Sequence, residues 1–206
     1  MKKVFLPLLL LCSSLHGTAQ LTAADVTKAK DMVFFGLDFT FLKLIHEEGF
    51  VDKNGKPMCK TLPFKYFNEW NEMFLIERDK FNLTRYFGVP NYTVDQTKAT
   101  ERNKAYVTEG CIIASDSYKV LPTELTEAVQ EYGSGSQFGI GCVIFVESFN
   151  KTDGKSVVYT VFFDLSDHAI LKIDEQEGSP FGDGFRNYWV NAIDKALNKG
   201  SKAYKR

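Results

Sequence analysis

The feature that most constrains the fold is a pair of runs near the C-terminus that are apolar on both sides. In the run SVVYTVFFDL, Val157 and Val161 would share one face of a strand, and Val158 and Phe162 the other. The preceding run GCVIFVESF is apolar on both sides in the same way. Strands of this kind lie inside a sheet that is covered on each face. We therefore expect a sheet with other elements packed on both faces.

A third strand is expected from the run HAILKI, in which Leu171 and Ile173 point inward and Lys172 outward. This alternation suits an edge strand or a strand with one solvated face. The turns NKTDGK and DLSDH between the three runs are short, so the strands should form an antiparallel meander. In the second turn we interpret Asp164 as an Asx-type turn former and His168 as the residue with positive φ.

Three other stretches have the apolar spacing of amphipathic helices: residues 63–80, 122–133 and 185–199. Thr123 is expected to be the N-cap of the second helix, because a hydroxyl there can accept a first-turn N–H. The segment DQTKATERNKAY, residues 95–106, is polar nearly all round. If it is helical, we expect it to be exposed.

Residues 32–45, MVFFGLDFTFLKLI, are dominated by aromatic and branched side chains and are predicted to form one strand, with Gly36 marking a bulge or kink. The order is then strand, helix, a mixed middle, helix, three-strand meander and helix. We predict an α/β (α+β) fold: a mixed sheet with a C-terminal three-strand antiparallel meander and helices packed on the sheet.

The N-terminal residues MKKVFLPLLLLCSSLHGTAQ have the pattern of a secretory signal peptide: two lysines, a short apolar run, then small and polar residues. We expect residues 1–20 to be removed and residues 21–206 to form a single α/β domain. Cys12 leaves a lipid-anchored alternative open, although Leu11 is bulkier than a lipidation motif favours. The protein is thus expected to be exported, as a periplasmic, outer-envelope-associated or secreted protein.

The charge of the chain argues against several partners. Loss of Lys2 and Lys3 with the leader would change the formal net charge from −1 to −3. A mildly acidic protein is a poor general binder of nucleic acid or of anionic membranes. No apolar run beyond the leader approaches the ~18 residues that a transmembrane helix needs. We expect no nucleic-acid partner and no transmembrane span.

The cysteines and histidines that remain are few. Cys59, Cys111 and Cys142 are too few, and odd in number, for a disulfide scaffold. Cys111 and Cys142 lie in apolar runs, where they would either pair across neighbouring strands or act as small hydrophobic residues. Only His46 and His168 remain beyond the leader, and HExxH and CxxC are absent from the sequence. We expect no metal and no cofactor.

Three segments, GIGCVIFVESFNK, VVYTVFFDLSDHAILKIDEQEG and GFRNYWVNAIDKAL, resemble a family of small exported proteins of unknown function from Bacteroidetes-type bacteria. The resemblance covers residues 139–197, and more loosely residues 35–38 and the helix with Trp70. No activity is attached to that family, so it implies no functional residues. In topology alone, the chain also resembles the α/β domain of curli-secretion and Tol-type periplasmic proteins, and topology does not fix function.

Two carboxylates, Asp38 and Glu147, lie in or beside apolar strands and are the candidate catalytic residues. Burial can raise the pKa of a carboxyl group into the range useful for a general acid. The alternative is that each lies at a strand end or edge, partnered by lysine. The segment GSGSQFG is not a nucleophile elbow, because it lacks G-x-S-x-G and follows a helix rather than a strand.

The glycine-rich stretch GSPFGDGFRNYW before the last helix supplies the candidate binding residues Phe181, Gly182, Gly184 and Arg186. The alternative is that this stretch docks the helix onto the sheet. In that case Asp183 would be the N-cap. A phosphate cradle of the nucleotide type would need GK[ST], which does not occur here.

Three functions remain open from the sequence. The first is a non-enzymatic envelope protein that binds another envelope protein or is a subunit of an assembly. The second is a protein that binds a small molecule or glycan in an aromatic cleft. The third is a hydrolase that uses Asp38 with Glu147. A pocket with two convergent carboxylates would favour the enzyme, a dry pocket the ligand binder, and an exposed apolar patch the partner binder.

Overall fold

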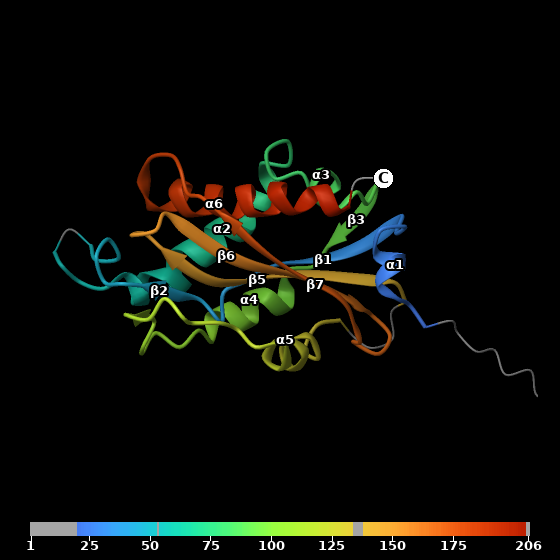
Figure 1. The fold of residues 1–206 in the computed structure, drawn as a ribbon, viewed down its shortest axis with the longest axis horizontal. Helices are drawn as coiled ribbons and strands as arrows, with labels where there is room; N and C mark the ends of the chain where they lie inside the picture. The colour runs from blue at the N-terminus through green and yellow to red at the C-terminus, as the bar shows by residue number, and fades with distance from the viewer. Residues whose placement is uncertain (1–19, 53, 134–137, 205–206) are drawn as a thin grey trace, which may run out of the picture.

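The computed structural model describes residues 20–52, 54–133 and 138–204. Residues 1–19 of the predicted signal peptide, Cys12 among them, lie outside the described residues. Figure 1 shows a sheet with helices on both of its faces.

The central strand of the sheet is β5 (Ile140–Asn150), which is buried along its whole length. It pairs antiparallel with β6 (Lys155–Asp164), and β6 pairs antiparallel with β7 (Ile170–Gly178). The predicted C-terminal meander is therefore confirmed, with β7 as an edge strand. In its second turn, Asp164 Oδ1 accepts the Ser166 N–H (2.8 Å) and His168 has a φ of +59°, as the sequence predicted.

The other side of β5 is occupied by two shorter strands placed end to end. β1 (Asp31–Asp38) runs parallel to the first part of β5, and β2 (Lys43–Ile45) runs parallel to its last part. The prediction of one continuous strand over residues 32–45 was wrong, because the chain leaves the sheet between these two strands. The predicted irregularity at Gly36 is confirmed, since its φ is +92° and the register shifts there.

Each half of this broken strand carries its own outer neighbour. β1 pairs in parallel with β3 (Asn91–Val94), and β2 pairs in parallel with β4 (Ile112–Ile113). The five parallel strands and the antiparallel meander together form one mixed α/β sheet.

Helices cover both faces of the sheet (Figure 1). One face carries α2 (Phe67–Ile76), α3 (Leu83–Phe87) and α6 (Gly184–Gly200), and the other carries α4 (Thr97–Lys104) and α5 (Pro122–Val129). Short helical turns complete the set: α1 (Ala23–Val26), a π-turn at Leu62–Tyr66 that leads into α2, and 3-10 turns at Met58–Lys60 and Ser201–Ala203.

The N-cap predicted for the helix at residues 122–133 was wrong. Leu121, rather than Thr123, occupies the N-cap position of α5. Its backbone N–H donates to the Glu124 carboxylate at 2.7 Å, so a side chain inside the first turn satisfies this backbone group.

The sheet separates two hydrophobic cores. The larger core contains both tryptophans, Trp70 and Trp189, which are at most 1% exposed, and Phe149 stacks on Trp189 with ring centroids 4.3 Å apart. The smaller core lies under α5 and includes Tyr132 and Phe145. Fully buried aromatic side chains of this size contribute about 1.5–3 kcal/mol each through burial.

The prediction that residues 95–106 would be exposed was wrong, because α4 buries two of its residues. Ala99 is fully buried and Asn103 is 2% exposed. The Asn103 amide accepts the Phe39 N–H (2.7 Å) and donates to the Leu37 carbonyl (2.9 Å). Asn71 of α2 bonds Leu37 from the other side of the sheet, accepting its N–H at 2.8 Å. Two asparagines thus satisfy the backbone groups where β1 is irregular.

The two ends of the described chain lie far from β2. Figure 1 places α1 and the end of α6 at one end of the long axis, and β2 toward the other.

Candidate functional site

The carboxylate of Asp38 lies at the end of β1, where the chain leaves the sheet, and is fully buried. Its Oδ2 accepts hydrogen bonds from Arg102 Nε and from the Tyr132 hydroxyl, both at 2.6 Å. Its Oδ1 accepts the Thr40 backbone N–H (2.8 Å) and the Thr40 hydroxyl (2.6 Å). Four donors therefore surround this carboxylate.

The partners of Asp38 connect it to α4 and to the turn that follows α5. Arg102 comes from α4, and its remaining nitrogens contact Glu131 and the Thr40 hydroxyl. Burial opposes the charged form of Arg102, but the neighbouring Asp38 outweighs it and raises the pKa of the guanidinium. Burial and the Asp38 charge also raise the pKa of Tyr132 well above its usual value. The network fixes the break between β1 and β2 against α4 and against the turn that follows α5.

Glu147 lies at a second irregularity, where the β5–β6 register shifts between Val146 and Ser148. It is 1% exposed, and its Oε2 accepts the Val120 N–H (2.8 Å) and the Tyr159 hydroxyl (2.9 Å). Burial raises the pKa of Glu147. Tyr159 also reaches Glu175, which contacts Lys119 at the surface.

The two candidate catalytic carboxylates do not share a hydrogen-bond partner among the described residues. Asp38 bonds Thr40, Arg102 and Tyr132, whereas Glu147 bonds Val120 and Tyr159. Neither residue lines any of the three surface hollows described below. Their surroundings are those of carboxylates that satisfy backbone and side-chain donors inside the fold.

Two side chains hold the glycine-rich stretch at the start of α6 by donating to its backbone carbonyls. Asn191 Nδ2 donates to the Phe181 carbonyl (2.9 Å), and the Trp70 indole N–H donates to the Arg186 carbonyl (2.8 Å). Gly182 and Gly184 have φ values of +99° and +76°, which only glycine adopts readily. These contacts support the interpretation that the stretch docks the last helix.

The capping role predicted for Asp183 was wrong. Asp183 occupies the N-cap position of α6, but its side chain makes no capping hydrogen bond. The hollow nearest to this helix start has a volume of about 260 Å³ and is lined by Gly49, Lys151, Gly184, Phe185, Tyr188 and Trp189. Gly184 is the one predicted binding residue that contributes to it.

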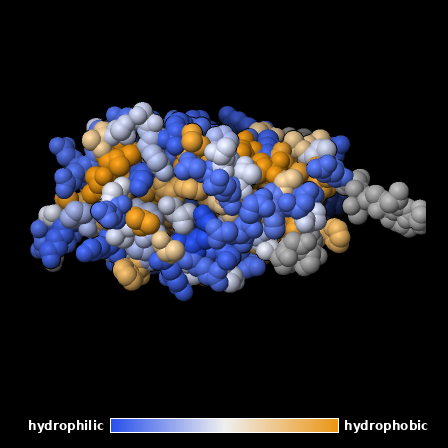
Figure 2. Space-filling view, turned by 90° about the horizontal axis from the view of Figure 1, so that it is seen from below, coloured by the Kyte–Doolittle hydropathy of each residue, from blue (hydrophilic) through white to orange (hydrophobic). Residues whose placement is uncertain are grey.

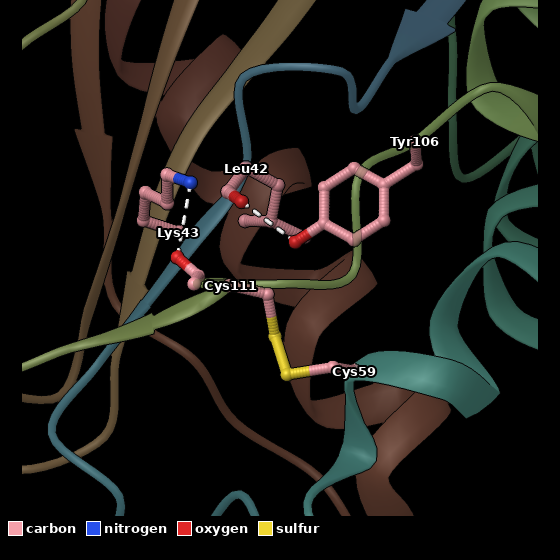
Figure 3. The surroundings of a disulfide bond; sticks show 6 residues. Leu42, Lys43, Cys59, Tyr106 and Cys111 are labelled. Atoms are coloured by element: carbon pink, nitrogen blue, oxygen red, sulfur yellow. Dashed lines mark hydrogen bonds between the residues drawn. A yellow bond between two sulfur atoms is a disulfide. The ribbon is translucent and has the colours of Figure 1, made fainter.

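The disulfide bond is the part of the structure that the sequence analysis missed. Cys59, in the turn before α2, is bonded to Cys111, which directly precedes β4, with the Cα atoms 6.0 Å apart (Figure 3). The proposed Cys111–Cys142 pair was wrong, because β2 lies between β4 and β5. Cys142 is a free, fully buried thiol in β5.

Two hydrogen bonds hold the chain near this disulfide. Figure 3 shows the Tyr106 hydroxyl donating to the Leu42 carbonyl (2.8 Å) and Lys43 Nζ donating to the carbonyl of Gly110 (3.0 Å). Burial raises the pKa of Tyr106, so its hydroxyl stays protonated and can donate this bond at neutral pH. The segment before β4 is thus joined to the start of β2 by two hydrogen bonds and to the turn before α2 by the disulfide.

The largest hollow described here lies against the disulfide and has a volume of about 770 Å³. Its lining contains both cysteines and five charged residues. The lining residues are Glu47, Asp52, Lys56, Pro57, Cys59, Lys60, Thr61, Thr108, Glu109, Gly110, Cys111 and Ile112. A second hollow of about 680 Å³ adjoins it, since Glu47 and Ile112 line both. Volumes in this range suit a ligand or several side chains of a partner. We call these two hollows the β4 hollows.

Other kinds of site receive less support from the surface. Figure 2 shows the face that α4 and α5 cover as largely hydrophilic, with hydrophobic residues in small separate groups. No three His, Cys, Asp or Glu side chains among the described residues are grouped so that they could hold a metal ion. In the same part of the chain, no helix is long and apolar enough to cross a bilayer.

Comparison with protein-family models, curated proteins and solved structures finds no match to this chain.

Proposed function

We propose that this protein is an exported, non-enzymatic envelope domain that binds another envelope protein at the β4 hollows. The observation that carries the proposal is the position of the largest hollow, which lies at a sheet edge and away from both buried carboxylates. Binding residues are commonly found on loops that a rigid scaffold positions. Here the disulfide and the Lys43 and Tyr106 hydrogen bonds provide that rigidity.

The proposed compartment rests on two observations. The N-terminal residues have the pattern of a signal peptide. The Cys59–Cys111 disulfide supports the same location, since such bonds persist mainly in oxidising compartments such as the periplasm and the cell exterior.

A second candidate function is the binding of a small molecule. The size of the larger hollow, about 770 Å³, favours it, because ligand pockets commonly fall within ~300–1,000 Å³. The lining argues for a protein partner instead. Ligand pockets are mainly apolar and aromatic, whereas this hollow carries five charged residues and no aromatic side chain among those described. The hydrolase alternative lacks support, since four donors already surround Asp38.

The proposal is tested by capture from an envelope extract with tagged residues 21–206 as bait. Thr108→Arg places a long cation in the larger hollow, and Thr84→Arg makes the same change at an exposed position on α3. We expect the wild type and Thr84→Arg to capture the same protein and Thr108→Arg to lose it. Equal capture by all three baits, or no specific protein with any of them, would contradict the proposal.

A further inference from the structure

The strand β4 forms an open edge of the sheet. It consists of Ile112 and Ile113, which are half-buried, and β2 is the one strand that pairs with it among the described residues. The opposite edge, β7, is much longer and carries Lys172, Asp174, Glu175 and Glu177. Charged residues on an edge strand discourage the addition of another strand. The β4 strand itself carries no charge, so it lacks that protection.

The main-chain groups of Ile112 face away from the sheet. The Cys111 carbonyl accepts the Leu44 N–H, and the Ile113 carbonyl accepts the His46 N–H, both at 2.8 Å. In a parallel pair the residue between these two directs its N–H and C=O to the other side. Within the described chain, neither group of Ile112 has a hydrogen-bond partner. An extended backbone is the chemical group that satisfies both at once.

The two β4 hollows lie next to this edge, one after the other along the chain. The larger is lined by residues 108–112, and the other by residues 112–114, so they meet at Ile112. Successive side chains of an added strand would be ~3.3 Å apart along it and would alternate between its faces. Hollows on both sides of Ile112 could therefore receive side chains of a strand bound there.

The charge around the hollow at residues 112–114 is acidic. Glu47 and Glu48 are exposed and take part in no ion pair among the described residues. The one cationic candidate in its described lining is His46, whose Nε2 already lies 3.1 Å from Asp116 Oδ1. A basic side chain would complement this hollow.

We infer that the β4 edge binds an extended, basic segment of the partner protein, which adds to the sheet as a further strand beside Ile112. This inference rests on the proposed function and specifies the class of partner. The main chain of the segment pairs with the Ile112 N–H and C=O, and a lysine or arginine side chain lies over Glu47 and Glu48.

The test uses a displayed library of short random peptides selected on tagged residues 21–206, followed by affinity measurement of the selected peptides. Ile112→Pro removes the outward N–H but none of the groups that bond β2, and Ile112→Val keeps the main chain as the matched control. We expect extended peptides rich in lysine or arginine. Their affinity should fall about 10-fold or more with Ile112→Pro, as expected for the loss of one main-chain hydrogen bond that the bound strand would bury.

A second variant tests the charge without touching the sheet. Glu47→Gln with Glu48→Gln changes two exposed side chains, so the fold is retained, and the affinity for basic peptides should fall several-fold and lose much of its salt dependence. Failure to select any peptide, acidic or proline-rich peptides, or equal binding by Ile112→Pro would overturn the inference. A partner captured equally by wild type and Ile112→Pro would overturn strand addition but leave the proposed function standing.

Discussion

Removing the Cys59–Cys111 bond is expected to destabilise the protein strongly, and the size of the effect follows from its place in the chain. The two cysteines are 52 residues apart in the sequence. Closing a loop of that length in the unfolded chain lowers its entropy, which corresponds to about 4 kcal/mol at 25 °C in the chain-entropy model. The double variant Cys59→Ser, Cys111→Ser should lose about that much free energy of unfolding.

The assay is guanidinium unfolding followed by tryptophan fluorescence. Trp70 and Trp189 are both buried in the larger core, so unfolding exposes them together. The double variant should unfold at a lower midpoint, and its m-value should rise because its unfolded state is less compact. Wild type treated with a dithiol reductant should match the variant, and Cys142→Ala should respond to the reductant as wild type does. A loss below about 1 kcal/mol would refute the entropic argument.

Three further perturbations have defined outcomes. Asp38→Asn removes the fully buried negative charge that pairs with the partly buried Arg102 and should cost about 3 kcal/mol in the free energy of unfolding, measured by urea denaturation. The pKa of Glu147 is raised in the folded protein, so this residue stabilises the wild type most below its ordinary pKa of about 4.3 and loses that stabilising effect as the pH rises. A glutamine at this position does not titrate. The free energy of unfolding of Glu147→Gln should therefore rise relative to that of the wild type as the pH rises from about 4 to 7. Gly178→Ala would place its Cβ 1.8 Å from the Ala192 carbonyl oxygen and should cost about 3 kcal/mol, seen as a lower Tm.

Matched controls separate these effects from nonspecific damage. Glu131→Gln changes the exposed partner of Arg102 and should cost less than about 1 kcal/mol in the free energy of unfolding. An equal loss in Asp38→Asn and Glu131→Gln would argue against the stabilising role of the Asp38–Arg102 pair. Gly55→Ala changes a glycine of positive φ with no atom within 4 Å of the added Cβ. It should cost only about 1 kcal/mol, and a similar loss at Gly178 would argue against close packing there. A pH-independent difference for Glu147→Gln would contradict the raised pKa.

The C-terminal meander could be predicted because its evidence is local. The side chains of β6 alternate between two cores, and the turns on either side are short. The break between β1 and β2 could not be predicted, since Phe39 and Leu42 continue the apolar pattern through it. Both are fully buried although they lie outside the strands. An apolar run therefore reports burial without reporting whether the backbone stays in the sheet.

The role of α4 depends on contacts that no local pattern contains. Asn103 is buried because its amide bonds the backbone of Leu37 and Phe39, more than 60 residues earlier in the chain. Arg102 likewise finds Asp38 only after folding. The sequence left open whether Asp38 and Glu147 are buried or lie at strand ends with lysine partners. Asp38 is both buried and at the end of β1, and its donors Arg102 and Tyr132 come from distant segments. The disulfide has the same character, since the partner of Cys111 is set by the path of the loop at residues 46–61 rather than by any spacing.

The position of the chain ends has a practical consequence. Figure 1 shows α1 and the end of α6, the last long helix of the chain, at the end of the molecule that is far from β2, and β4 is the neighbour of β2. A tag fused after Arg206 would therefore attach the protein to a sensor chip by the far end. The β4 edge would then face the solution, so peptides flowed over the chip could reach Ile112 without obstruction by the support.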